Sequence, residues 1–222
     1  MRYKILFIVS WSLFACQNNT IAYKPSSSGN INTVTVVMEN SLWESSIGNA
    51  TREAFASEFI GLPQQEPIFS LKQIPPSTFS DFTRESRNIL VIQKTKKDTV
   101  ILSRDRYAKP QVLVELLGST KRKIIKNIKE NKKTIINEIK KNDLKEKQRR
   151  MQISPLKTGD LRSLLSIELI IPSAYEVFKK NKNKIIWLQK ETKKGSVNVL
   201  AYELSTKDPL NSFSRKKIIK IR

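Results

Sequence analysis

Isoleucine recurs at helical spacing over residues 119–152, and this stretch constrains the fold more than any other part of the chain. At about 100° of turn per residue, the isoleucines fall within about 120° of arc, the usual width of a core-facing stripe. A basic row runs along another side of the same helix, and Ser119 or Thr120 can cap the start. The stripe comprises Ile124, Ile125, Ile128, Ile135, Ile136 and Ile139, and the basic row comprises Arg122, Lys126, Lys129, Lys133, Lys140 and Lys147. The pattern predicts one long amphipathic helix that packs on a second layer.

Short runs rich in Val, Ile and Leu supply that layer, at residues 31–38, 88–94, 98–103 and 111–118. Such runs are typical of strands. Between the first two runs, residues 40–55 have apolar side chains at helical spacing, with Asn40 or Ser41 as the cap and Glu44 as the capping-box partner. Residues 61–79 contain four prolines and are expected to be an extended connection. We therefore predict an α+β domain over residues 30–153, with a mainly antiparallel or mixed sheet packed by the long helix.

The pattern changes after the long helix, where Pro155 and Gly159 interrupt it. We expect a short helix near 158–165, a strand at 166–172, and a hairpin formed by 184–190 and 196–204. Gly195 suits the turn of that hairpin. The last residues, 212–222, suggest the start of a helix. Residues 154–222 are thus expected to form a smaller α+β portion, incomplete at its end.

The first 15 residues have the organisation of a signal peptide. Arg2 and Lys4 precede eleven uncharged residues, too few to span a ~30 Å hydrocarbon core as a helix. The sequence LFAC at 13–16 resembles the bacterial lipobox. The resemblance implies that Cys16 receives a diacylglycerol and that cleavage occurs between Ala15 and Cys16, leaving residues 16–29 as a flexible tether. An embedded anchor with an incidental cysteine is the alternative.

The net charge of +21 suggests a nucleic-acid partner, but the composition argues against one. An exported chain does not meet nucleic acid, and the excess is 29 Lys against 12 Arg, whereas planar phosphate recognition favours Arg. Abundant Lys, Ile and Asn are also the residues of A+T-rich codons. Two interpretations of the basic row remain, a solvated face enriched by codon usage and a face that rests on anionic lipid headgroups.

The residue types present exclude several kinds of catalysis. The chain has no histidine and a single cysteine, which removes histidine-based catalysis and leaves no thiol once Cys16 is acylated. No glycine-rich phosphate loop is present. The candidate carboxylates are Glu39, Glu44, Glu53, Glu58 and Glu66, and a candidate stacking platform comprises Trp43, Tyr107, Tyr175, Trp187 and Tyr202. We expect no metal, no cofactor and a non-enzymatic binding or structural role; the alternative is a carboxylate-dependent hydrolase of envelope glycans or peptides.

Several stretches resemble an uncharacterised lipoprotein family of Bacteroidota, a family of unknown function. They include GNINTVTVVMENSLWES, GLPQQEPIFSLKQIPPSTF, RNILVIQK, YAKPQVLVEL, LKEKQRR, IPSAYEVF and WLQKETKKGSVNVLAYEL, and they cover about residues 29–204. The resemblance implies a lipobox signal, an α+β body and an envelope location, but no activity and no site residues. Residues 17–22 lack the acidic cluster of surface-export signals, so we expect the body to face the periplasm, with its protein or polymer partner unidentified.

Overall fold

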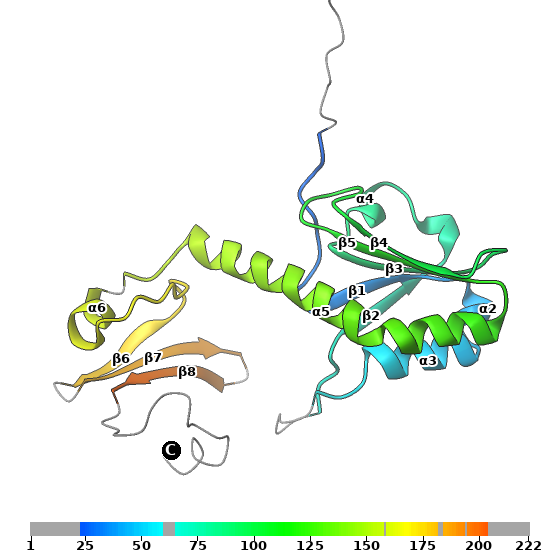
Figure 1. Cartoon of the computed structure of the whole chain (residues 1–222). Helices are drawn as coiled ribbons and strands as arrows, with labels where there is room; N and C mark the ends of the chain where they lie inside the picture. The colour runs from blue at the N-terminus through cyan, green and yellow to red at the C-terminus, as the bar shows by residue number, and fades with distance from the viewer. Residues whose placement is uncertain (1–22, 60–64, 158, 182–183, 194, 204–222) are drawn as a thin grey trace, which may run out of the picture. The chain divides into compact units, whose positions relative to one another are not determined.

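The computed structural model describes residues 23–59, 65–157, 159–181, 184–193 and 195–203, which are coloured in Figure 1. The chain divides into two compact units, with the boundary between Asp143 and Leu144. Within the described residues, no helix is both long enough and apolar enough to cross a membrane.

The first unit is built on a five-stranded mixed sheet with the order β2-β1-β3-β5-β4. The pairs β1–β2, β1–β3 and β3–β5 are parallel, and β4 pairs antiparallel with β5. This arrangement confirms the predicted α+β class and its mixed sheet. The strands are β1 (Thr33–Val37), β2 (Ser70–Ile74), β3 (Asn88–Lys94), β4 (Thr99–Arg104) and β5 (Val112–Gly118).

Strand β2 lies inside the proline-rich segment that we expected to be a connection only, so that prediction was wrong. Ser70 to Ile74 pair in parallel with Thr33 to Val37 and form an edge of the sheet. Pro67, Pro75 and Pro76 stand outside Ser70–Ile74 and interrupt no hydrogen bond between β1 and β2. After β2, the chain makes a 3₁₀ turn at Pro76–Thr78 and the short helix α4 (Asp81–Arg84).

The predicted helix over 40–55 is two helices, α2 (Asn40–Trp43) and α3 (Ser46–Phe55). The break occurs because the Ser45 hydroxyl accepts a hydrogen bond from the Ile47 N–H at 3.2 Å and caps a new helix. Ser45 therefore caps α3, and Glu39 occupies the N-cap position of α2, so neither Asn40 nor Ser41 is a cap. Helix α3 buries one face, which includes Ile47 and Phe55.

Helix α5 (Lys121–Ile153) is the predicted long helix, and Thr120 helps to cap it by accepting from the Lys123 N–H at 3.3 Å. Its isoleucine stripe faces the sheet as predicted. Ile124, Ile128, Ile135 and Ile139 are buried in one cluster with the inward side chains of β1, β3 and β5, while Ile125 and Ile136 are partly buried against it. Figure 1 shows α3 and α5 on the same side of this sheet.

The second unit contains a three-stranded antiparallel sheet, β6-β7-β8, and the short helix α6 (Gly159–Leu165). The strands are β6 (Glu176–Asn181), β7 (Ile185–Thr192) and β8 (Gly195–Tyr202). The predicted hairpin is confirmed as β7–β8. A small core of Leu161, Ile171, Ile186 and Leu188 lies under one face of this sheet.

Two predictions for this unit were wrong. Residues 166–172 form no strand; Ser166 has a φ of 54° and ends the regular backbone of α6, and Pro172 makes only an isolated bridge with Pro155. Strand β6 was missed because EVFKKN alternates poorly and carries three charges. The helix suggested at 212–222 lies outside the described residues.

Candidate membrane-facing surface

All members of the basic row on α5 are exposed. Lys126 forms an ion pair with Glu130, with 3.7 Å between Nζ and Oε1 and each side chain 60% exposed. The Lys140 ammonium lies 5.1 Å from the centre of the Phe59 ring. Among the described residues, Arg122, Lys129, Lys133 and Lys147 form no ion pair. The row is therefore open to an external anion along most of its length.

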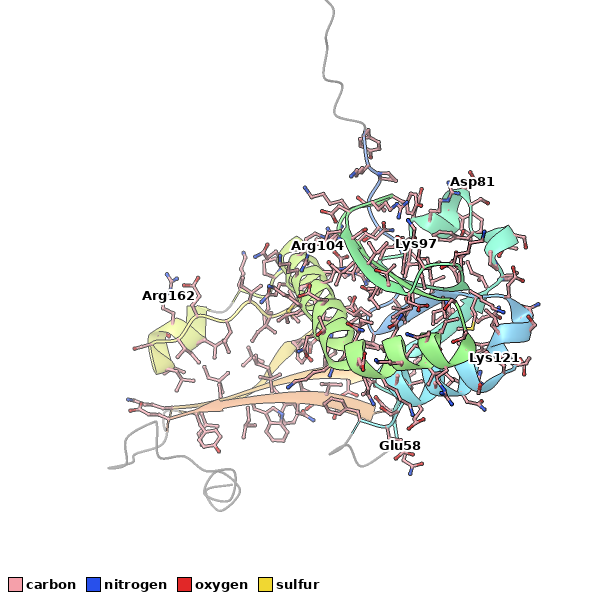
Figure 2. The ribbon with its side chains drawn as sticks, turned by 45° about the vertical axis from the view of Figure 1, so that its right-hand side comes forward. Glu58, Asp81, Lys97, Arg104, Lys121 and Arg162 are labelled. Carbon is pink, nitrogen blue, oxygen red and sulfur yellow. The ribbon has the colours of Figure 1, made fainter. Side chains whose placement is uncertain are left out.

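The acidic side chains of α5 do little to neutralise this row, because most of them are engaged elsewhere. Glu138 pairs with Arg104 of β4, and Glu146 binds Arg149 and Arg150, which follow it on the helix. The hydrogen bonds that Arg149 donates to the Glu146 carboxylate raise the pKa of Arg149 above its ordinary value. Lys121, at the start of α5, and Arg104 are labelled in Figure 2.

A buried polar cluster fixes how α5 runs along the first sheet. The Asp143 carboxylate accepts hydrogen bonds from the Asn32 N–H at 2.8 Å and from the Asn88 amide at 3.0 Å. Asn32 and Asn88 lie at the amino ends of β1 and β3, whereas α5 begins just after the carboxyl end of β5. Lys140 thus lies near the amino ends of the strands, and Arg122, eighteen residues earlier, lies about 27 Å away along the helix.

The chain enters the first unit at this same end. The backbones of Ser26 and Ser28 form parallel bridges with Lys109 and Ser86, and the Lys109 N–H donates to the Pro25 carbonyl at 2.9 Å. Residues 25–29 are therefore part of the folded unit and do not belong to a flexible tether. Cys16 and Ala15, the predicted acylation and cleavage residues, lie outside the described residues.

The candidate carboxylates all lie at the surface of the first unit. Glu39, Glu44, Glu53, Glu58 and Glu66 are all exposed. One of them, Glu39, lines a hollow of about 380 Å³ together with Ser41, Gln93 and Lys94. Among the described residues, no group of three or more acidic, histidine or cysteine side chains could hold a metal ion.

That hollow has a defined place in the sheet. It lies at the carboxyl ends of β1, β2 and β3. The strand that follows β1 lies at one edge of the sheet and the strand that follows β3 lies at the other edge, so the strand order reverses here. Open α/β sheets commonly bind ligands at such a switch point. The hollow offers one carboxylate and one ammonium group, a set that suits binding better than acid–base hydrolysis.

The candidate aromatic platform separates into four places. Trp43 carries the Arg52 guanidinium over its ring at 4.4 Å, Tyr107 packs edge-on against Phe79, and Tyr175 borders the second core. The strand register places Trp187 and Tyr202 on the same face of the second sheet. Sequence reasoning missed Phe178, whose ring lies 4.8 Å from the Trp187 ring, because β6 had not been predicted.

Two families of unknown function match the chain. Residues 27–152 match the family described as a domain of unknown function, DUF8532, and residues 154–222 match a second domain of unknown function, DUF4837. No curated protein and no solved structure matches the chain. Because the first match covers more than half of the sequence, the chain belongs to the uncharacterised DUF8532 family.

Proposed function

We propose that this protein is a lipid-anchored bacterial envelope protein of Bacteroidota type, with a non-enzymatic role at a membrane surface. Acylated Cys16 provides the anchor, and the basic row of α5 provides a second, electrostatic contact with anionic headgroups. The observation that carries the proposal is the location of the row: Lys140 lies near the end of the sheet at which the chain enters the unit.

The length of the tether agrees with this arrangement. The backbone is bonded into the first unit from Pro25 onward, nine residues after Cys16. A nine-residue chain with random-coil dimensions has an end-to-end distance of about 15–18 Å. The Lys140 end of α5 is then within reach of headgroups, and each basic side chain near such a surface contributes up to ~1 kcal/mol. The Arg122 end contacts lipid only if the unit lies flat.

Vesicle binding tests the electrostatic contact. The chain from residue 17 onward, made without lipid, is mixed with vesicles that contain or lack an anionic lipid, at low and at physiological salt. We expect binding that requires the anionic lipid and falls with salt. The double variant Lys133→Gln/Lys140→Gln should bind more weakly than Arg122→Gln/Lys126→Gln.

A matched control uses Lys96→Gln/Lys97→Gln, which removes the same charge from exposed residues between β3 and β4. Lys97 is labelled in Figure 2. Equal weakening by all three double variants would indicate a general charge effect and would exclude a specific face. Absence of binding at physiological salt would leave the row as a solvated surface.

The anchor is tested separately, through Cys16→Ser. The parent should incorporate a labelled fatty acid and sediment with membranes, whereas the variant should do neither. Persistent labelling of the variant would show that the lipobox interpretation is incorrect. Protease added to intact cells should leave the body uncut if it faces the periplasm.

A second candidate is the carboxylate-dependent hydrolase, and the hollow at Glu39 is the observation that favours it. Glu39→Gln keeps the side-chain shape and removes the charge. If the parent released soluble fragments from envelope glycan or peptide and this variant did not, the enzymatic role would replace the binding role. We expect no release from either protein.

A further inference from the structure

The outer face of the second sheet carries an unusual set of exposed apolar side chains. One face of this sheet covers Leu161, Ile171 and α6, as described above. The register pairs Ile185 with Tyr202 and Trp187 with Leu200 on the opposite, outer face. Figure 2 shows side chains projecting from β7 and β8 on the side away from α6. Together with Phe178, these four residues form what we call the aromatic face.

The aromatic face is open to solvent. Phe178 is 60% exposed, Leu200 is 53% exposed, and Ile185 and Tyr202 are each more than one third exposed. Trp187 is half-buried, with its ring against Phe178 at 4.8 Å between centroids. Contiguous exposed apolar patches on folded units often mark interaction sites or ligand-binding grooves.

Polar groups continue the same face beyond Trp187. The indole N–H of Trp187 donates to the Asn198 side chain at 2.8 Å, and the Asn198 amide donates to the Ser196 hydroxyl at 3.2 Å. Gln189, paired across the sheet with both Glu176 and Asn198, lies beside them. Glu176, Gln189, Phe178 and Glu191 line a hollow of about 470 Å³, within the ~300–1,000 Å³ range of small-ligand sites.

The presence of both aromatic rings and polar groups on this face favours one class of partner over the others. An apolar partner would remove water from the Glu176 carboxylate and from the Gln189 amide oxygen, and each hydrogen-bonding group left unsatisfied costs about 1–3 kcal/mol. A second copy would also bring together two segments of net charge +9, because residues 151–222 contain 15 basic and 6 acidic side chains. A pyranose sugar meets both halves of the face, because its C–H surface stacks on aromatic rings and its hydroxyl rim hydrogen-bonds amides and carboxylates.

We propose that the aromatic face is a carbohydrate-binding site for a β-linked glycan chain, with Phe178, Trp187 and Tyr202 stacking on successive sugar rings. Gln189, Glu176 and Asn198 bind the hydroxyl or acetamido groups at the side. The proposal goes beyond the membrane-surface role and does not depend on acylation of Cys16. It assigns a glycan ligand to the second unit of a chain that the proposed anchor places in the envelope.

The test uses the full chain in a detergent without a sugar headgroup. The probe is a β-1,4-linked N-acetylglucosamine hexamer, titrated by calorimetry and by tryptophan fluorescence. We expect saturable binding and a fluorescence change that disappears in Trp187→Phe, because the other tryptophans lie outside the second unit. Trp187→Ala and Phe178→Ala should each weaken binding by about tenfold or more, the size of a central aromatic contact.

Two further variants separate the site from the stability of the sheet. Gln189→Ala removes a hydrogen-bonding group without altering the aromatic packing and should weaken binding while leaving the thermal melt unchanged. Val197→Ala truncates an exposed residue of the same sheet, on the opposite face by register, and should change neither property.

The outcomes of this titration are decisive. No saturable binding of the hexamer by the folded parent overturns the proposal, as does equal weakening by Gln189→Ala and Val197→Ala. Concentration-dependent dimerisation that Trp187→Ala abolishes, without sugar binding, would assign the face to a second copy. Because no vesicle is used, failure here leaves the membrane-surface proposal standing.

Discussion

The carboxylate of Asp143 joins α5 to the first sheet, and its removal should destabilise that unit more than removal of any exposed acid. Its side chain is 2% exposed, and the Arg87 side chain, 1% exposed, has its Nη1 atom 3.8 Å from Oδ1. The carboxylate also accepts from the Asn32 N–H and from the Asn88 amide. The substitution Asp143→Ala removes all three interactions together.

The size of the effect follows from burial. Removal of one partner of a buried ion pair typically costs about 3–5 kcal/mol, because the remaining charge is left in a poorly solvated site. That is a large share of the ~5–15 kcal/mol that stabilises a typical domain. For a unit of this length, we expect Tm to fall by about 10–20 °C. Asp143→Asn, which keeps the shape and one acceptor oxygen, should cost about half as much.

The assay is urea unfolding followed by Trp43 fluorescence, in a chain that starts at residue 17 and carries Trp187→Phe. The signal then reports on the first unit alone, so unfolding of the second unit does not distort it. Glu130→Ala is the matched control: it breaks an ion pair whose members are each 60% exposed and should change stability by less than about 0.5 kcal/mol. If Asp143→Ala lay within 1 kcal/mol of the parent, the polar cluster would not be what holds α5 on the sheet.

Three other substitutions or titrations test the fold at separate places. Gly48→Ala would place a Cβ 1.7 Å from the Trp43 carbonyl oxygen, so we expect a loss of at least about 2–3 kcal/mol in urea unfolding, and an unchanged midpoint would contradict the α2–α3 packing. Ile128→Asp should abolish cooperative melting by circular dichroism, because it replaces ~1.5–3 kcal/mol of burial with a buried charge; a parent-like melt would place the stripe in water. The Asp98 carboxylate accepts from the Ser119 N–H at 2.6 Å and from its hydroxyl at 2.8 Å, which lowers the pKa of Asp98. The stabilisation that this carboxylate contributes is therefore complete at pH values above its pKa in the unfolded chain, about 3.9, and is lost as the pH falls through its lower pKa in the folded chain. A ¹³C titration of the Asp98 carboxyl should give a midpoint below 3.9, and a midpoint at or above 3.9 would refute the contact.

The fold could be predicted best from the sequence where a single helix or strand shows its own pattern of apolar residues. The isoleucine stripe and the basic row of α5 could be predicted from spacing alone, because both depend on the 3.6-residue repeat and on no other part of the chain. The strands β3 and β5 were equally clear, since apolar runs buried on both sides need no alternation.

Features that depend on pairing between distant residues could not be predicted in this way. Strand β2 consists of SLKQI, with a polar or charged residue at three of five positions, and it becomes a strand only by pairing with β1. Asn142 and Asp143 are polar residues in line with the isoleucine stripe, a detectable irregularity, but their partners in β1 and β3 are known only from the register. The aromatic face has the same origin, because Phe178, Trp187 and Tyr202 come from three different strands.

The order of the first sheet also bears on how the chain acquires its structure. Strand β1 is the first strand in the sequence, yet it lies inside the sheet, between β2 and β3. Thr33 pairs with Ser70, and Thr35 pairs with Ile89, 37 and 54 positions later along the chain. Parallel pairings at such separations form slowly because a long loop must close before any contact is gained. Until residues 88–94 arrive, the apolar segment TVTVVM at 33–38 has an unpaired edge, the kind of segment that aggregates. Folding of the first unit is therefore expected to be late and cooperative, and sensitive to any factor that holds this early segment apart from other chains.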